Sequence, residues 1–536
     1  SSDLAIKQLN DIDDRKGLNF KPHEGSDDGD DVDVPGTEGT DIDKTKGGPL
    51  EDNPASKSHE NTKPEENLTK KLATFYSQIL FFAFLTDSKV ISLAEIIESI
   101  INSDDNKRIA KNLGLDLNIL KLFLRHCNPF ILSDLDYKIQ NINDKSHDEN
   151  LTTQEKVEHA LNKFGKLSIS EVVTPSWVAQ QIIKQLPEEA ANGKMLDIAS
   201  KEGEFAIELI NRFGDKIKSK IFSIPTSSAS YEFTLKIYKL LGLPQENIFS
   251  DFNSYDLFEV DPLKYNETII NKLRNMNFSS IVGNPPYQKM DDGHGASAKP
   301  IYHHFVYTAQ QLHPTYISMI MPSRWYAGGK GGELVEFRKM MAKDKHLIRI
   351  DDYRRSSDCF ENVEIKGGVC YFLWNKEQSI DECRFVSHSE GKIESDRTRL
   401  LIYPNTETII RFNDAISILE KVQSKRLGSF NQIVSSRKPF GLASNFRNYE
   451  PNQDSEHSVF IYAQKDKGYA SPTVILRNHE WKDKYKIYIP EAIGKGDMTQ
   501  DVLKPILGEP NTICSETYIL IGPFDEKEIA ERVFRY

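Results

Sequence analysis

Short apolar runs with β-branched centres alternate with segments of helical periodicity from about residue 160 to residue 375. Because strands that alternate with helices are typical of a parallel sheet, this pattern predicts a doubly wound, Rossmann-like α/β domain. Seven strands are expected, at 195–199, 220–224, 247–251, 278–282, 316–321, 347–353 and 368–374. Helices are expected between them, at 204–213, 229–241, 300–312 and 333–341.

The chain on either side of this pattern differs in composition. Residues 1–66 are rich in Asp, Gly, Ser and Lys and lack apolar periodicity, which predicts a disordered acidic arm. Residues 67–155 are expected to form a helical region that ends in a polar linker over 136–155. The α/β domain is then assigned to 156–400, and residues 401–536 are expected to form a separate α+β domain.

The formal net charge of −12 is concentrated in the acidic arm, which holds 18 acidic and 8 basic residues. The rest of the chain is nearly neutral, so charge does not exclude a nucleic-acid partner. Five scattered cysteines without a C-x-x-C pair favour a reducing cytoplasm. No apolar run reaches the roughly 18 residues of a membrane span, so no membrane partner is expected. The chain lacks an initiator Met and stops within a helical pattern, so we expect a fragment.

The predicted strand 278–282 is followed by the sequence Gly-Asn-Pro-Pro-Tyr. Pro285 and Pro286 fix φ and remove amide donors, which leaves a stiff tip where ligands bind in open α/β sheets. The Asn284 amide oxygen and the Pro285 carbonyl are two acceptors suited to a planar NH2 group such as adenine N6. The Tyr287 ring can stack on the plane that carries this group. The alternative is an ordinary Pro-Pro loop that closes a strand.

Three other segments suit a cofactor. A strand end at Asp197 leads through a turn with Gly203 into a helix, which suits the amine of an amino-acid-like cofactor. The turn is not G-x-G-x-x-G, so dinucleotide binding is poorly supported. An acid and an aromatic end the third predicted strand and suit a purine, and a Thr-Pro pair opens a helix upstream. Each segment alone is more often structural than functional.

The order of these elements, Thr-Pro, Asp…Gly-x-Phe, Asp-Phe and Asn-Pro-Pro-Tyr, resembles the gamma class of AdoMet-dependent DNA adenine-N6 methyltransferases. The segments 300–305, 319–325 and 363–374 are similar to the methylase domain of large restriction–modification enzymes. The resemblance covers about residues 160–536. It implies a seven-stranded methyltransferase sheet, AdoMet as the cofactor and duplex DNA as the partner.

The resemblance also implies roles for individual residues. Asn284, Pro285, Pro286 and Tyr287 would hold a flipped adenine. AdoMet would be bound by Thr174, Pro175, Asp197, Ala199, Gly203, Phe205, Asp251 and Phe252. The sequence departs from the family's usual pattern at Lys201 and Glu202, where small residues are common, and the second strand lacks its usual terminal acid.

A basic stretch in the C-terminal region suits DNA. Six basic and no acidic residues lie between Glu420 and Glu450, interleaved with Asn, Gln and Ser, which suits contacts to phosphates and base edges. The six are Lys421, Lys425, Arg426, Arg437, Lys438 and Arg447. The alternative is a solvated α+β domain. The segment also resembles the target-recognition domain of Taq-type methyltransferases, which would be longer than this copy if the chain is cut short.

We therefore expect a site-specific DNA methyltransferase that acts on adenine N6 in a restriction–modification system. No metal is expected, and the pair His303-His304 is expected to pack at a helix start. The alternatives are a DNA-binding specificity module with a lapsed methylase, or a methyltransferase that acts on RNA or on a protein glutamine amide. A restriction nuclease or motor, as a domain or subunit outside this chain, is an open alternative partner.

Overall fold

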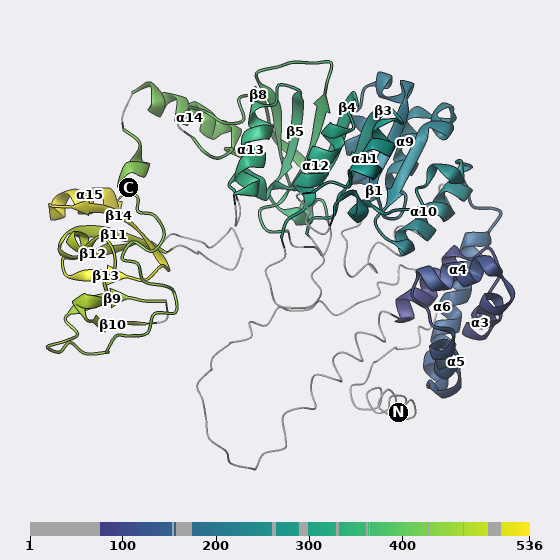
Figure 1. Ribbon diagram of the computed structural model, residues 1–536, viewed down its shortest axis with the longest axis horizontal. Helices are drawn as coiled ribbons and strands as arrows, with labels where there is room; N and C mark the ends of the chain where they lie inside the picture. Colours follow the sequence, from purple (N-terminus) through teal and green to yellow (C-terminus); the bar gives the residue numbers. More distant parts are fainter. Residues whose placement is uncertain are drawn as a thin grey trace, which may run out of the picture. The chain divides into compact units, whose positions relative to one another are not determined.

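The computed structural model describes residues 75–152, 155–156, 174–259, 264–288, 299–328, 332–360, 363, 365–404, 406–425, 428–464, 466–490 and 505–535. The chain divides into two compact units, residues 1–402 and 403–536, and most of their elements are labelled in Figure 1. The predicted acidic arm lies outside the described residues. None of the described helices is long and apolar enough to cross a membrane.

A mixed eight-stranded sheet organises the first unit (Figure 1). Its strands are β1 (Lys194–Ser200), β2 (Ile221–Pro225), β3 (Phe278–Gly283), β4 (Tyr316–Pro322), β5 (Leu347–Tyr353), β6 (Val369–Asn375), β7 (Cys383–Ser389) and β8 (Lys392–Arg399). They lie in the order β2-β1-β3-β4-β6-β5-β7-β8. The strands from β2 to β4 are parallel, and β6 runs antiparallel to its neighbours. The predicted α/β class is confirmed.

Helices connect the strands in the expected alternation. They are α8 (Ser176–Lys184), α9 (Glu204–Phe213), α10 (Ser228–Leu241), α11 (Glu267–Arg274), α12 (Tyr302–Gln311) and α13 (Glu333–Lys343). Helices α8 and α9 bury Ile182 and Phe205 in a cluster that also contains Met195, Val282 and Ile320 of the sheet. This cluster supports β1 and β3, the two strands on which the candidate site is built.

The strand predicted at 247–251 is absent, which is a correction. Residues 245–247 form a short 3-10 helix, and Ile248 makes a single parallel bridge with Ser223. The Asn247 side chain donates to the carbonyls of Ser219 and Ile221, at 3.2 and 3.0 Å. A side chain therefore occupies positions at the edge of β2 where the backbone of another strand would pair.

Strands β7 and β8 were not predicted, and with six of the seven predicted strands formed, the sheet has eight strands rather than seven. In β8 only the last residue, Arg399, is buried, and the other positions are polar and exposed or half-buried apart from the exposed Ile393. Such a strand lacks the apolar run or clear apolar alternation that marks a strand in a sequence. It is held instead by its antiparallel pairing with β7.

The Asp351 carboxylate on β5 accepts four hydrogen bonds. It has no exposed surface. One oxygen accepts from Gln185 Nε2 at 2.6 Å and Arg349 Nε at 2.6 Å, and the other accepts from Arg349 at 2.8 Å and His388 Nε2 at 2.7 Å. The network links α8, β5 and β7.

Replacing Asp351 with alanine is expected to lower the free energy of unfolding by about 3–5 kcal/mol, because a buried ion pair loses one partner. Urea unfolding followed by tryptophan fluorescence measures this loss. The control is Asp396→Ala, which breaks a half-exposed pair with Arg384 and is expected to cost at most about 1 kcal/mol. Equal losses in both variants would contradict the role of the Asp351 network.

A helical bundle precedes the sheet domain within the first unit. It consists of a helix over residues 75–85 and of α3 (Leu93–Asn102), α4 (Asp104–Asn112), α5 (Leu117–His126) and α6 (Pro129–His147). The stretch from residue 136, predicted as a linker, continues α6 to His147. Leu135, Ile139 and Ile142 recur at helical spacing and are buried, and Asn143 donates to the carbonyls of Ala83 and Ser88.

The second unit, residues 403–536, contains two three-stranded sheets around one core cluster. Its elements are α14 (Asn413–Ser424), β9 (Val459–Tyr462), β10 (Lys467–Ala470), β11 (Tyr485–Pro490), β12 (Ile506–Gly508), β13 (Thr512–Cys514), β14 (Tyr518–Phe524) and α15 (Lys527–Arg535). The sheets have the orders β10-β9-β13 and β12-β11-β14.

Candidate active site

The candidate site lies where β1 and β3 end side by side. The two strands are parallel, with Asp197 opposite Val282. Gly283, the last residue of β3, has φ +155°, and a Cβ atom added there would lie 3.2 Å from Ile198 Cγ2 and 3.4 Å from Asp197 Oδ1. Glycine at this position therefore allows the end of β3 to lie close against the Asp197 carboxylate of β1.

Asn284 begins the tip that follows Gly283. Its side chain has no exposed surface, and its Nδ2 atom donates to Thr174 Oγ1 at 3.1 Å. Thr174 is itself buried at the entry of α8. This bond fixes the plane of the Asn284 amide. The orientation of Asn284 Oδ1, the acceptor predicted to face an amine, therefore depends on Thr174, which lies 110 positions earlier in the sequence. Thr174 was expected to lie near the cofactor, and its contact with Asn284 was not foreseen.

The rest of the tip is anchored on both sides. Pro285 and Pro286 are buried and Tyr287 is half-buried. The Tyr287 carbonyl accepts from the Ile301 amide at 3.1 Å, which fixes the end of the tip to the segment before α12. The Tyr287 hydroxyl is buried without a hydrogen-bond partner among the described residues, and burial raises its pKa. The tip is therefore rigid, as its two prolines predict.

The predicted cofactor turn joins β1 to α9. Gly203 precedes α9 with φ +77°, a conformation that favours glycine. The Glu202 amide donates to Glu204 Oε2 at 3.1 Å, so the turn before the helix binds the carboxylate of the first helical residue. All residues from 201 to 205 are buried. A turn of this kind at a helix N-terminus is suited to bind an anionic or amino-acid-like group.

Three buried carboxylates surround this turn. Asp197, Glu202 and Glu204 are 0%, 6% and 1% exposed. Asp197 Oδ2, Glu202 Oε2 and Glu204 Oε1 are buried without a hydrogen-bond partner among the described residues. Burial, and then the neighbouring Glu204, raises the pKa values of Asp197 and Glu202. The buried Lys201 opposes both shifts without cancelling them. Buried carboxylate oxygens without hydrogen bonds are costly unless a cationic partner meets them. These residues therefore fit a ligand that carries a positively charged amine.

The raised pKa of Glu202 predicts how stability depends on pH. The folded chain holds this proton more tightly than the unfolded chain, whose Glu titrates near its usual 4.5. Stability of the ligand-free protein is therefore expected to fall as the pH rises from about 4.5 toward the raised folded pKa. In Glu202→Gln this loss is expected to be smaller, as measured by urea unfolding at pH 5 and pH 8. The exposed control Glu246→Gln is expected to retain the full loss. An unchanged pH dependence in Glu202→Gln would contradict this account.

One protein family matches the part of the chain that contains β1 and β3. Residues 196–360 match the Eco57I restriction-modification methylase family. The matched segment contains Asp197, the turn at Gly203 and the Asn284 tip. The predicted resemblance to restriction–modification methylases is confirmed for this Eco57I-type segment, and membership of the gamma class stays a prediction.

One relative shares a large part of this sequence. An uncharacterized adenine-specific methylase of Mycoplasma pneumoniae is 32% identical over 247 residues, which are 43% of this chain. The match covers 57% of that relative's length, so the chain spans little more than half of it.

Solved structures resemble the chain more remotely. A type I restriction-modification methyltransferase subunit from Streptococcus thermophilus has a TM-score of 0.39 at 12% identity, over 69% of this chain and 80% of the other. A DrdV–DNA complex has a TM-score of 0.45 at 10% identity, over 89% and 61%.

The other residues predicted to bind a cofactor have different surroundings. Ala199 and Phe205 are buried, and Phe205 packs in the core cluster. Asp251 is exposed, and its carboxylate accepts from Lys272 Nζ at 2.7 Å, which lowers its pKa. Phe252 packs against Phe249 with ring centroids 4.9 Å apart. The structure thus brings Thr174, Pro175, Asp197 and Gly203 close to the tip or the turn, while Asp251 is engaged in a surface ion pair.

The two adjacent histidines lie in the first turn of α12. Both are buried, with ring centroids 4.0 Å apart, and His303 packs on Phe337 at 5.8 Å. His303 Nε2 lies 3.6 Å from a Glu333 oxygen, and ligand atoms of His303, His304 and Glu333 lie within 4.8 Å of one another. Burial lowers the pKa of His303 to about 3, so it is neutral at physiological pH. Aromatic packing accounts for the position of this pair.

The six basic residues predicted to bind DNA have different surroundings. Arg426 lies outside the described residues. Lys421, Lys425 and Arg447 are exposed. Arg437 and Lys438 instead lie 3.8 and 3.1 Å from the carboxylate of Glu516, and Lys438 lowers the pKa of that acid. Glu516 follows β13 and lies about 80 positions after Arg437 and Lys438 in the sequence. The charges counted between residues 420 and 450 therefore did not include it.

Proposed function

We propose that the protein transfers the methyl group of AdoMet to N6 of adenine in duplex DNA, as the modification activity of a restriction–modification system. The observation that carries the proposal is the close approach of Gly283 on β3 to the buried carboxylate of Asp197 on the neighbouring parallel strand β1. Gly283 directly precedes Asn284, whose amide is also buried. An acceptor for an amine and a partner for a cationic cofactor are thus adjacent, as methyl transfer between them requires.

The residues of the cofactor turn fit AdoMet. Asp197 and Glu202 would bind its amine, since both carry carboxylate oxygens without partners among the described residues. Gly203 allows the backbone to turn into α9 below the ligand. AdoMet supplies an electrophilic methyl group on a positively charged sulfur. Ionised carboxylates nearby favour that charge in the bound cofactor.

The tip would hold the base. Adenine must leave the helical stack to reach the site, at a cost of roughly a few kcal/mol. Asn284 Oδ1 and the Pro285 carbonyl would accept the two hydrogens of N6, and the Tyr287 ring would stack on the purine. Thr174 keeps the Asn284 amide in one orientation. Catalysis would come mainly from orientation and from preorganised acceptors.

The second unit would contribute DNA contacts. Lys421, Lys425 and Arg447 are exposed cations that suit phosphates. Arg437 and Lys438 are partly neutralised by Glu516, so they suit positioning of the loop more than a strong phosphate contact.

The substrate class can be tested with a panel. The chain is incubated with AdoMet labelled in the methyl group and with unmethylated duplex DNA of mixed sequence, duplex RNA or a glutamine-containing peptide. Label is expected in DNA alone, and Asn284→Ala serves as the control for enzyme-dependent transfer. Label in RNA or peptide but not in DNA would contradict the proposal. AdoMet binding without transfer to any of the three would favour a lapsed methylase.

A further inference from the structure

Helix α10 supports the cofactor turn from one side. Thr234 Oγ1 lies 3.0 Å from Ser200 Oγ at the end of β1, and Tyr238 OH lies 2.9 Å from Ser223 Oγ on β2. Thr234 and Tyr238 have no exposed surface. These positions are four apart, so they lie on one face of the helix.

The same face of α10 touches the turn itself. A Cβ atom added to Gly203 would lie 3.1 Å from both Cβ and Cγ2 of Ile237, which is buried. The backbone of the turn therefore rests directly on an α10 side chain. A movement of α10 would shift Ser200 and Gly203, which flank the buried carboxylates.

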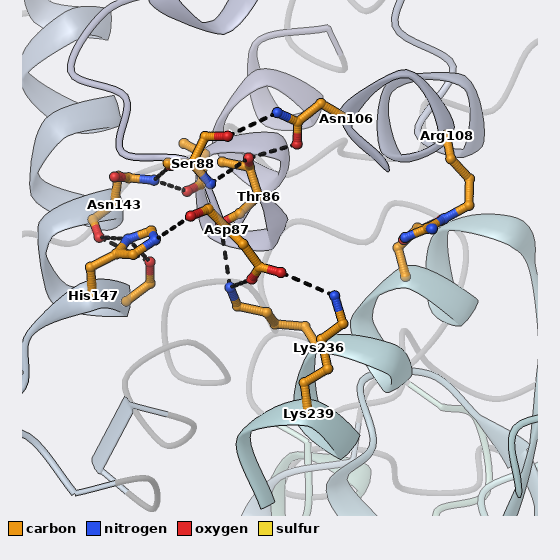
Figure 2. Close-up of polar contacts among 12 residues, drawn as sticks. Thr86, Asp87, Ser88, Asn106, Arg108, Asn143, His147, Lys236 and Lys239 are labelled. Atoms are coloured by element: carbon orange, nitrogen blue, oxygen red, sulfur yellow. Dashed lines mark hydrogen bonds and ion pairs between the residues drawn. The ribbon is translucent and has the colours of Figure 1, made fainter. Parts of the chain in front are cut away.

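The opposite face of α10 is held by the N-terminal bundle. Lys236 Nζ donates to Asp87 Oδ1 at 2.8 Å and to the Thr86 carbonyl at 3.3 Å, and Lys239 Nζ donates to Asp87 Oδ2 at 3.0 Å (Figure 2). One carboxylate thus binds two lysines that lie three positions apart on the helix. Lys236 is buried, and both partners lower the pKa of Asp87 to about 2 against the effect of burial.

A second contact lies further along the same interface. Glu232 on α10 is 2% exposed and accepts from Arg108 Nε at 3.0 Å, Arg108 NH2 at 3.2 Å and Asn112 Nδ2 at 2.6 Å. Phe233 packs against Phe81 and Phe84, with ring centroids at 5.1 and 6.2 Å. A bidentate ion pair and an aromatic cluster therefore join α10 to α4 and to the helix over 75–85.

The segment that carries Asp87 is itself fixed. Thr86 Oγ1 donates to Asn106 at 2.7 Å, and the Asn106 amide donates to Ser88 Oγ at 3.1 Å. The Asp87 carbonyl lies 3.2 Å from His147 Nε2 of α6, as Figure 2 shows. These bonds fix the backbone on either side of Asp87. The Asp87 carboxylate is therefore held in position to accept from the lysines of α10.

We propose that the N-terminal bundle, residues 75–147, is a positioning element for the cofactor turn and acts through α10. The inference rests on the proposed function, because it gives the bundle a role in AdoMet binding. The bundle holds the outer face of α10 through Asp87 and Glu232, and the inner face of α10 holds Ser200 and Gly203. Loosening the outer contacts weakens AdoMet binding without touching any residue that contacts the cofactor.

The test is Asp87→Ala in the full chain. The dissociation constant for AdoMet, measured by calorimetry, is expected to rise about threefold to tenfold, since two partly exposed ion pairs are lost. The KM for AdoMet is expected to rise with it, while kcat at saturating AdoMet stays within about twofold. Asp87→Glu is expected to restore most of the affinity. Glu232→Gln tests the second contact and is expected to act in the same direction.

The matched control is Asp134→Ala. Asp134 is a bundle acid that accepts from Tyr76 and pairs with Lys138, both within the bundle. The substitution weakens the bundle, and Asp134 makes no hydrogen bond or ion pair with α10 among the described residues, so AdoMet affinity is expected to stay unchanged. Equal losses of affinity in Asp134→Ala and Asp87→Ala would overturn the inference, because general destabilisation would explain both.

Hydrogen exchange separates this inference from the proposed function. Amides of α10 and of residues 200–204 are expected to exchange faster in Asp87→Ala, with or without AdoMet. Unchanged exchange together with unchanged affinity would overturn the inference. Absence of AdoMet binding by the unmutated chain would contradict the proposed function, and exchange at 200–204 alone would then decide whether the bundle supports the turn.

Discussion

Replacing Asn284 with alanine is expected to lower the rate constant for methyl transfer by about 10³-fold or more, because a preorganised hydrogen-bonding group at the reacting atom is lost. Asn284 is fully buried and is oriented by Thr174. Alanine leaves the backbone of the tip intact, since Pro285 and Pro286 fix its course. AdoMet binding and DNA binding are therefore expected to persist. Single-turnover transfer of labelled methyl measures the rate constant.

Two further variants sharpen this prediction. Thr174→Val removes the partner of the Asn284 amide, and the rate constant is expected to fall about tenfold, as for one lost hydrogen bond. Thr174→Ser keeps the hydroxyl and is expected to retain most of the activity. Loss of DNA binding together with activity in Asn284→Ala would contradict a role confined to the reacting amine.

Asp197→Asn is expected to raise the dissociation constant for AdoMet about 30- to 100-fold, equivalent to about 2–3 kcal/mol for a hydrogen bond to a charged group. The ligand-free protein is expected to lose no stability. Asp197 is buried close to Glu204, and its Oδ2 atom has no partner among the described residues, so asparagine removes an unfavourable charge. Affinity and stability should therefore change in opposite senses, as is typical of a binding site.

Calorimetry and thermal unfolding, each with and without AdoMet, measure the two quantities. AdoMet is expected to raise the unfolding temperature of the unmutated chain and to do so far less in the variant. The control is Asp351→Asn, which alters a buried carboxylate whose oxygens are both engaged. It is expected to lower stability and to leave AdoMet affinity unchanged. A destabilised Asp197→Asn with normal affinity would contradict the assignment.

The sequence predicts those parts of the fold that local patterns specify. Helix α9 was predicted with its observed bounds, since a turn glycine precedes its apolar periodicity and Gly214 ends it. The segment 247–251 has the composition of a strand, but the Asn247 side chain occupies the edge of β2. The polar strand β8 has almost no apolar signal and depends on pairing with β7.

The sequence could predict those site residues that lie at or near the carboxyl ends of predicted strands. Asp197 lies within one predicted parallel strand and Asn284 closely follows another, and the carboxyl ends of such strands meet at one edge of the sheet. The bond from Asn284 to Thr174 and the contact of Gly203 with Ile237 join distant parts of the chain. Neither has a local pattern in a single sequence. The same holds for Glu516, which pairs with two of the predicted DNA-binding residues.

The most direct test of the proposed function is the identity of the methylated atom. Duplex DNA is methylated with labelled AdoMet, digested to nucleosides and separated, with Asn284→Ala treated in parallel. We expect the label in N6-methyl-2′-deoxyadenosine from the unmutated chain and none from the variant. Label in a methylated cytosine, or equal label from the variant, would contradict adenine N6 as the target and Asn284 as the residue that binds it.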